Sequence, residues 1–137
     1  PTANDDELGS VSTGKGAIKL DVLANDIDID VGDSISIKGV SSDGTTYTSS
    51  SSTDLGNRIS ISSGKISYTP STKTSGNDSF YYKIIDEDGE EATAQATLKL
   101  SSNTNPDALN DTLSLAEDAS TAEDTELKVL SNDTDLD

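Results

Sequence analysis

Residues 78–86, DSFYYKIID, and residues 92–100, ATAQATLKL, decide the fold of this chain. In both stretches apolar or aromatic residues alternate with other residues, which is the pattern of half-buried β-strands. In the first stretch Phe80, Tyr82 and Ile84 should face a core, and Tyr81 and Lys83 should face outward. The inward face of the second stretch consists of Ala92, Ala94, Ala96, Leu98 and Leu100. Because Asp88-Gly89 between them is a strong turn signal, the two stretches predict a β-hairpin.

Similar alternation runs through most of the preceding residues. Short apolar sets occur at residues 18–22, 35–37, 59–61 and 66–68, whereas residues 48–56, TSSSSTDLG, are predicted to be a polar loop. About seven short strands with frequent turn signals predict an all-β fold, an antiparallel β-sandwich.

An internal repeat divides the chain. Residues 22–30, VLANDIDID, recur as residues 129–137, VLSNDTDLD, at an offset of 107, and the opening PTANDD recurs as PDALND from Pro106, at an offset of 105. We therefore expect a complete sandwich over residues 1–103, followed over residues 104–137 by a linker and the start of a second copy. The Ala and Glu content of residues 114–127 would also suit a helix, but the repeat favours strand–loop–strand there.

Composition excludes several classes of function. The chain has 137 residues, with 26 Asp and Glu against 9 Lys and Arg, a formal net charge of −17, and neither His nor Cys. It therefore lacks the residues for a Ser-His-Asp triad, a thiol nucleophile or a Cys/His zinc site. The negative charge opposes binding to nucleic-acid phosphates, and with no Trp and few aromatic residues to stack sugars, no enzymatic activity is expected.

The ends and hydropathy of the chain give further expectations. No apolar run approaches the length that spans a bilayer, so membrane insertion is not expected. The opening residues lack the pattern of a signal peptide, and a first residue that is Pro instead of Met suggests a fragment of a longer polypeptide. Such a fragment is expected to be a monomer.

The acidic residues gather in short runs. These are Asn4-Asp5-Asp6, Asn25-Asp26-x-Asp28-x-Asp30-x-x-Asp33 and Asp86-Glu87-Asp88. Carboxylates at alternating loop positions repel one another unless a cation lies between them, and Ca²⁺ accepts six to eight oxygen ligands in flexible geometry, which suits it better than Mg²⁺. An EF-hand is excluded, because counting from Asp26 places Val31 where that loop needs Gly and Ile37 where it needs Glu.

The alternating direction of successive strands indicates where these runs meet. In an alternating sandwich, the loop after the second strand and the loop before the last strand lie at the end where the chain enters. We therefore predict a calcium site there from Asp5, Asp6, Asp26, Asp28, Asp30, Asp86 and Asp88. A second site is predicted at the junction between the repeats, from Asn105, Asp107, Asp133, Asp135 and Asp137. The alternative for any single residue is an acid that is merely solvated in its loop.

The ordered series of these patterns resembles a known family. PTANDD, DVLANDIDID, ISYTP and GNDSFYYKIIDEDGEEATAQATLKL are similar to the cadherin-like, immunoglobulin-like extender repeats of large bacterial surface adhesins, of the repeats-in-toxin and biofilm-associated type. The resemblance covers residues 1–103, and residues 106–137 as the opening of a second copy. It implies metal ligands at Asp26, Asp28 and Asp30, at Asp107 in the linker, and at Asp133, Asp135 and Asp137.

The resemblance also implies a function. It implies type I secretion to the bacterial cell surface, neighbouring repeats as partners, and a calcium-stabilised stalk that projects a ligand-binding tip for attachment or biofilm formation. In the absence of calcium the acidic residues would oppose compaction. Two alternatives remain open: a module that binds a glycan or a protein, for which aromatic residues such as Tyr47 or Tyr81 would be the sign, and homotypic cadherin-style adhesion.

Overall fold

The computed structural model describes residues 1–30, 32–72, 74–102, 107–112 and 130–134. The chain divides into two units, residues 1–103 and residues 104–137. All strands among the described residues lie in the first unit, and the described residues contain no helix long and apolar enough to cross a membrane. Residues 114–127, for which the repeat favours strand–loop–strand, lie outside the described residues.

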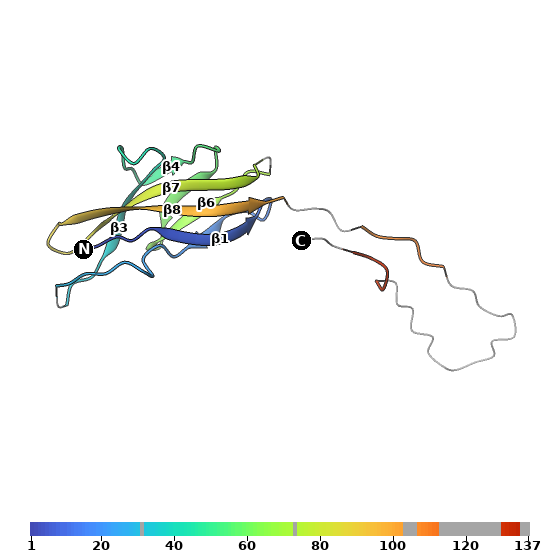
Figure 1. Ribbon diagram of the computed structural model, residues 1–137, viewed down its shortest axis with the longest axis horizontal. Coiled ribbons are helices and arrows are strands. Elements are labelled where there is room, and N and C mark those ends of the chain that lie inside the picture. The colour runs from blue at the N-terminus through green and yellow to red at the C-terminus, as the bar shows by residue number, and fades with distance from the viewer. Residues whose placement is uncertain (31, 73, 103–106, 113–129, 135–137) are drawn as a thin grey trace, which may run out of the picture. The chain divides into compact units, whose positions relative to one another are not determined.

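The first unit is a sandwich of two four-stranded sheets (Figure 1). One sheet has the order β1-β8-β7-β3 and consists of β1 (Asp6–Ser12), β8 (Glu91–Ser101), β7 (Gly76–Ile85) and β3 (Ser36–Ser41). The other has the order β2-β6-β5-β4 and consists of β2 (Ile18–Leu20), β6 (Lys65–Thr69), β5 (Arg58–Ser62) and β4 (Ser50–Ser52). The predicted all-β sandwich is confirmed.

The hairpin of β7 and β8 forms the centre of the first sheet, as its alternation predicted. The two strands pair antiparallel along their whole length, and Gly89 in the connection has a φ of 93°, which favours glycine over other residues. Phe80, Tyr82 and Ile84 are fully buried. They pack in one core with buried residues of the other strands, among them Val22, Val40, Ile59, Ile66, Tyr68, Ala96 and Leu100.

The sandwich departs from purely antiparallel pairing at β1. This strand pairs with β8 in parallel, from Asp6 opposite Ala96 to Ser12 opposite Ser101. Its register shifts between Glu7 and Ser10. Since the first and last strands run side by side in the same direction, the chain enters the unit at one end and leaves it at the other (Figure 1).

The predicted polar loop at residues 48–56 is wrong in one respect, because it contains β4. Ser50–Ser52 pair antiparallel with β5, from Ser50 opposite Ser60 to Ser52 opposite Arg58. A run of serines carries no apolar alternation, so its strand character comes from backbone hydrogen bonding at the edge of the sheet.

A buried polar network lies at the end of the sandwich where β7 begins. Asp78 Oδ2 accepts hydrogen bonds from Thr53 Oγ1 at 2.8 Å, from Asn57 Nδ2 at 2.7 Å and from the Tyr68 hydroxyl at 2.7 Å. Asn57 is fully buried, and its Oδ1 accepts the backbone N–H of Ser71 at 2.7 Å. Through the Asp78 carboxylate of β7, the network joins the loop between β4 and β5 to Tyr68 of β6.

The second unit is described at residues 107–112 and 130–134. Asp107 and Thr134 form an antiparallel bridge, with backbone N···O distances of 2.8 and 3.1 Å. This bridge holds together two segments that are separated in the sequence by residues outside the described part of the chain.

Candidate functional site at the acidic end

The loop after β2 lies against the segment that precedes β1. We refer to residues 1–5 as the leading segment and to residues 25–30 as the acidic loop. Thr2 and Ile27 join them through an antiparallel bridge with N···O distances of 2.7 and 3.1 Å. Two of the three acidic runs that the sequence placed at this end are therefore in direct contact.

Side chains of both segments strengthen this contact. The backbone N–H of Asn4 donates to Asp26 Oδ1 at 2.7 Å. The Asn4 side-chain amide donates to the Asn25 carbonyl at 2.8 Å, and the Asn25 amide donates to the carbonyls of Asn4 at 3.3 Å and Asp5 at 3.0 Å. The Asn-Asp pairs of the two runs therefore bind backbone.

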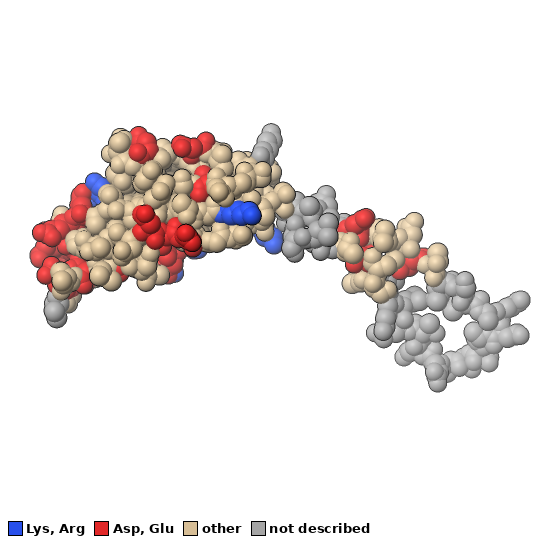
Figure 2. All heavy atoms as spheres, viewed as in Figure 1, with Lys and Arg blue, Asp and Glu red and all other residues tan. Residues whose placement is uncertain are grey.

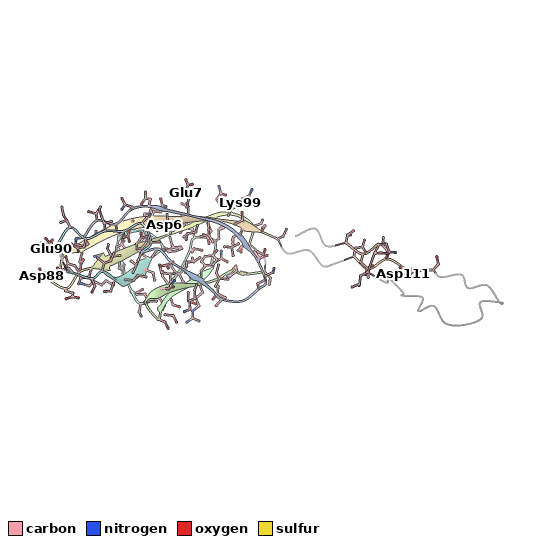
Figure 3. All side chains as sticks on the ribbon, turned by 90° about the horizontal axis from the view of Figure 1, so that it is seen from below. Asp6, Glu7, Asp88, Glu90, Lys99 and Asp111 are labelled. Atoms are coloured by element: carbon pink, nitrogen blue, oxygen red, sulfur yellow. The ribbon has the colours of Figure 1, made fainter. Side chains whose placement is uncertain are left out.

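Two of the predicted ligands, Asp6 and Asp26, lie within the sandwich near the Tyr82 hydroxyl. Both residues are more than nine-tenths buried, and Tyr82 Oη lies 3.1 Å from each carboxylate oxygen of Asp26. Burial raises the pKa of both carboxyls, and the neighbouring charge of Asp26 raises the pKa of Asp6 further. Figure 3 labels Asp6 well inside the sandwich, away from Asp88 at its end.

Asp28 and Asp86 lie at the end itself, on either side of one cationic group. The α-amino nitrogen of Pro1 is 3.5 Å from Asp28 Oδ2 and 3.7 Å from Asp86 Oδ2, and the two carboxylate side chains are 5% and 1% exposed. The backbone N–H of Asp30 donates to Asp28 Oδ1 at 2.9 Å, and this bond, followed by the α-amino charge, lowers the pKa of Asp28. Two buried carboxylates from separate loops thus lie within 4 Å of the same Pro1 nitrogen.

An exposed acidic rim surrounds this pair. Asp30, Asp33, Glu87 and Asp88 are exposed or partly exposed, and Figure 2 shows acidic side chains gathered at the end of the first unit that carries the N-terminus. Burial raises the pKa of Asp33, and the carboxylates of Asp88, Asp28, Glu87 and Asp30 raise it further. We define Pro1, Asp28, Asp30, Asp33 and Asp86–Asp88 as the acidic pole.

The predicted first site is therefore distributed over three places. Asp5 Oδ1 accepts the backbone N–H of Gln95 at 2.8 Å, so the Asp5 carboxylate binds the backbone of β8. Asp6 and Asp26 lie beside Tyr82, whereas the remaining predicted ligands Asp28, Asp30, Asp86 and Asp88 lie at the acidic pole. Within the described part of the chain, no three acidic residues are arranged closely enough to form a metal site as they stand.

The predicted second site is described only in part. Asp107 forms the bridge to Thr134 described above, and Asp133 Oδ1 accepts the backbone N–H of Leu109 at 2.9 Å. Asn105, Asp135 and Asp137 lie outside the described residues, so their predicted role as ligands stays a prediction.

Tyr82 and Asp33 were not among the predicted site residues, although each left a signal in the sequence. A tyrosine at an inward-facing strand position needs a buried partner for its hydroxyl, and the Tyr82 hydroxyl lies 2.9 Å from the Asn4 carbonyl oxygen and 3.1 Å from the Asp26 carboxylate. Asp33 follows the alternating run of Asp26, Asp28 and Asp30 after a gap of two residues. Both residues depend on contacts between loops and strands that sequence spacing does not specify.

Elsewhere among the described residues, an open groove and two tyrosines bear on the alternative of a ligand-binding module. An open groove of about 570 Å³ beside β1 is lined by polar residues such as Glu7 and Lys99, which Figure 3 labels, together with Gly9 and Leu98. The Tyr47 ring has the Lys83 ammonium 4.8 Å from its centroid. Tyr81 is only partly exposed, and its ring lies against Gly44, where an added Cβ would come within 3.4 Å of it. Neither aromatic residue is a free stacking platform.

Comparison with known proteins is consistent with this architecture. Searches of curated proteins and of solved structures found no match. A family model described as "Bacterial Ig domain" matches residues 1–99, which span the sandwich from the leading segment into β8. Domains of this kind are structural and non-enzymatic, and they typically occur in surface-exposed proteins. With nearly three quarters of its length matched and an Ig-like sandwich over the same residues, the chain belongs to the bacterial Ig domain family.

Proposed function

We propose that this chain is a stalk module of a secreted bacterial adhesin, and that calcium bound at the acidic pole stabilises it. The observation that carries the stalk function is the parallel pairing of β1 with β8. Because these are the first and last strands, a pull on the two ends of the unit shears this pair. All hydrogen bonds between two sheared strands share the load, whereas strands pulled apart from one end break their bonds one after another.

The acidic pole supports the calcium part of the proposal. Asp28 and Asp86 are buried carboxylates, and burying a charge costs several kcal/mol unless an opposite charge lies beside it. The cationic atom beside them is the Pro1 nitrogen, which carries a charge only when the chain begins at this residue and is a neutral amide when another repeat precedes it. Ca²⁺ would supply the same compensation with two charges, and the exposed carboxylates of Asp30 and Asp88 would add oxygen ligands near the pair.

Calcium would then act through mass action. For a dissociation constant of roughly 0.1–1 mM and a concentration of about 1–10 mM, one ion stabilises the fold by about 0.4–3 kcal/mol. For a domain of about 100 residues each kcal/mol corresponds to roughly 4–8 °C in melting temperature. Secretion by a type I route, a cell-surface location and adjacent repeats as partners complete the proposal. They rest on the resemblance and on the usual setting of bacterial Ig domains.

The calcium test is a melting curve in EDTA, in calcium and in magnesium at equal ionic strength. A variant with three residues added before Pro1 moves the α-amino charge away from the pole and should show a larger calcium effect. The double substitution Asp28→Asn with Asp86→Asn should abolish the effect, and Asp54→Asn, an exposed acid in the turn that follows β4, should not change it. An unchanged melting temperature of the extended chain in about 10 mM calcium would refute the calcium site.

The stalk function is tested separately by single-molecule force spectroscopy. Handles at residues 1 and 101 load β1 and β8 in shear, whereas handles at Ser41 and Tyr81, which are paired across β3 and β7, peel that pair from one end. The shear geometry should need the higher unfolding force. Equal forces in both geometries would contradict a load-bearing role.

A further inference from the structure

The acidic loop of the first unit and its counterpart in the second unit, which is described at residues 130–134, make the same backbone contact at equivalent positions. In the first unit the backbone N–H of Asn4 donates to Asp26 Oδ1 at 2.7 Å. In the second unit the backbone N–H of Leu109 donates to Asp133 Oδ1 at 2.9 Å. Leu109 follows Asn4 by 105 residues and Asp133 follows Asp26 by 107, which are the two offsets of the repeat.

The neighbouring bridge is repeated as well. Thr2 pairs with Ile27 in the first unit and Asp107 pairs with Thr134 in the second. These residues are again related by offsets of 105 and 107. Two neighbouring contacts therefore recur together, although the side chains at the paired positions differ.

We infer that the first aspartate of each NDxDxD run, Asp26 and Asp133, is a clasp that fastens the incoming chain to its acidic loop, and that it is not a metal ligand. The recurring acceptor is the aspartate oxygen, whereas the donor is a backbone N–H that any residue except proline supplies. This explains how Asn4 can be replaced by Leu109 without loss of the contact.

The donors around Asp26 indicate the same role. Its Oδ1 receives the Asn4 N–H, and both of its oxygens lie 3.1 Å from the Tyr82 hydroxyl, so it links the leading segment, the acidic loop and β7. The next acid of the run, Asp28, lies beside the α-amino group at the acidic pole instead. Only this last contrast, between clasp and ligand within one run, rests on the proposed calcium function.

The clasp positions the acidic loop by binding it to the leading segment. In the second unit it forms between residues 107–112 and 130–134, and the described residues include no β-sheet around it. Asp26 and Asp133 are thus positioning residues at the start of each unit.

The experiment measures amide hydrogen exchange of the whole chain by NMR in EDTA, where calcium plays no part. The Leu109 amide should be protected, and Asp133→Ala should reduce its protection about tenfold, the loss expected for one hydrogen bond of about 1.4 kcal/mol. Asp133→Asn keeps an acceptor oxygen and should retain the protection. These variants leave the first unit untouched, so its spectrum reports correct folding. Exchange of Leu109 at its intrinsic rate in the unaltered chain, or equal losses in both variants, would overturn the clasp.

A calcium titration of the whole chain, followed through the NMR signals of the first unit, separates clasp from ligand. Asp26→Asn should bind calcium within about threefold of the unaltered chain, whereas Asp28→Asn should weaken binding at least tenfold. Equal weakening by the two substitutions would make Asp26 a ligand and overturn the inference. If neither the unaltered chain nor the chain extended before Pro1 binds calcium, the proposed function fails while the exchange result still decides the clasp.

Discussion

The carboxylate of Asp78 should be the most sensitive polar group of the sandwich. Its Oδ2 accepts three hydrogen bonds of 2.7–2.8 Å from Thr53, Asn57 and Tyr68. All of these residues are at least 95% buried. Asp78→Ala therefore leaves three donors without their acceptor in a place that water does not reach freely.

The size of the effect follows from the number of donors. A buried donor without a partner costs about 1–3 kcal/mol, and the two hydroxyl groups can rotate toward other acceptors, so we expect a loss of about 3–6 kcal/mol. This is a large part of the roughly 5–15 kcal/mol that stabilises an ordinary domain. Tyr68→Phe removes only one donor and leaves the other two bonds in place, so it should cost about 1.5–3 kcal/mol.

Urea unfolding followed by tyrosine fluorescence and circular dichroism measures these losses. Asp54→Ala, an exposed acid in the neighbouring turn, is the control and should change the free energy of unfolding by no more than about 0.5 kcal/mol. A loss below about 1 kcal/mol for Asp78→Ala, or a loss no greater than that of Tyr68→Phe, would refute the reasoning that the network depends on one shared acceptor.

Three further predictions concern pH and packing. Burial raises the pKa of Asp6, so the folded chain binds a proton at this carboxyl more readily than the unfolded chain does. The free energy of unfolding in EDTA should therefore rise as the pH falls from about 7 toward the ordinary pKa of 3.8. Asp6→Asn should reduce that rise. Hydrogen bonds from Lys38 of β3 and Lys83 of β7 lower the pKa of Glu91 to about 2, so the stability that Glu91 contributes is present above its ordinary pKa of 4.5 and is lost toward pH 2. In the same urea series Glu91→Gln should reduce the fall in the free energy of unfolding between these pH values. An unchanged pH dependence would contradict this role of Glu91. Gly39→Ala should lower stability by about 1–3 kcal/mol, because its Cβ would lie 2.8 Å from Tyr47 Cβ. Ser36→Ala on the same strand should be nearly neutral, and equal melting temperatures of the two variants would show that the segment around Tyr47 moves to make room.

The candidate site shows where reasoning from the sequence stops. Strand parity correctly brought the leading segment, the acidic loop and the turn after β7 to one end, as the contacts of Pro1 with Asp28 and Asp86 demonstrate. It could not separate Asp26 from Asp28, because both occupy the same alternating run. Which of them points inward depends on the Tyr82 hydroxyl, and that residue is distant from both in the sequence.

The sequence by itself determined the sandwich, because period-two alternation in β7 and β8 leaves only one face of each strand to bury. It also determined the repeat and the oxygen-only chemistry of any cation site, since the chain has no His or Cys. The tertiary structure alone decided that β1 lies parallel to β8 and that Ser50–Ser52 form an edge strand. It also decided that Asp26 accepts a backbone N–H and that Asp78 accepts hydrogen bonds from buried side chains. The physical reason is that a carboxylate's role is set by the donors around it, and these donors come from segments that only folding brings together.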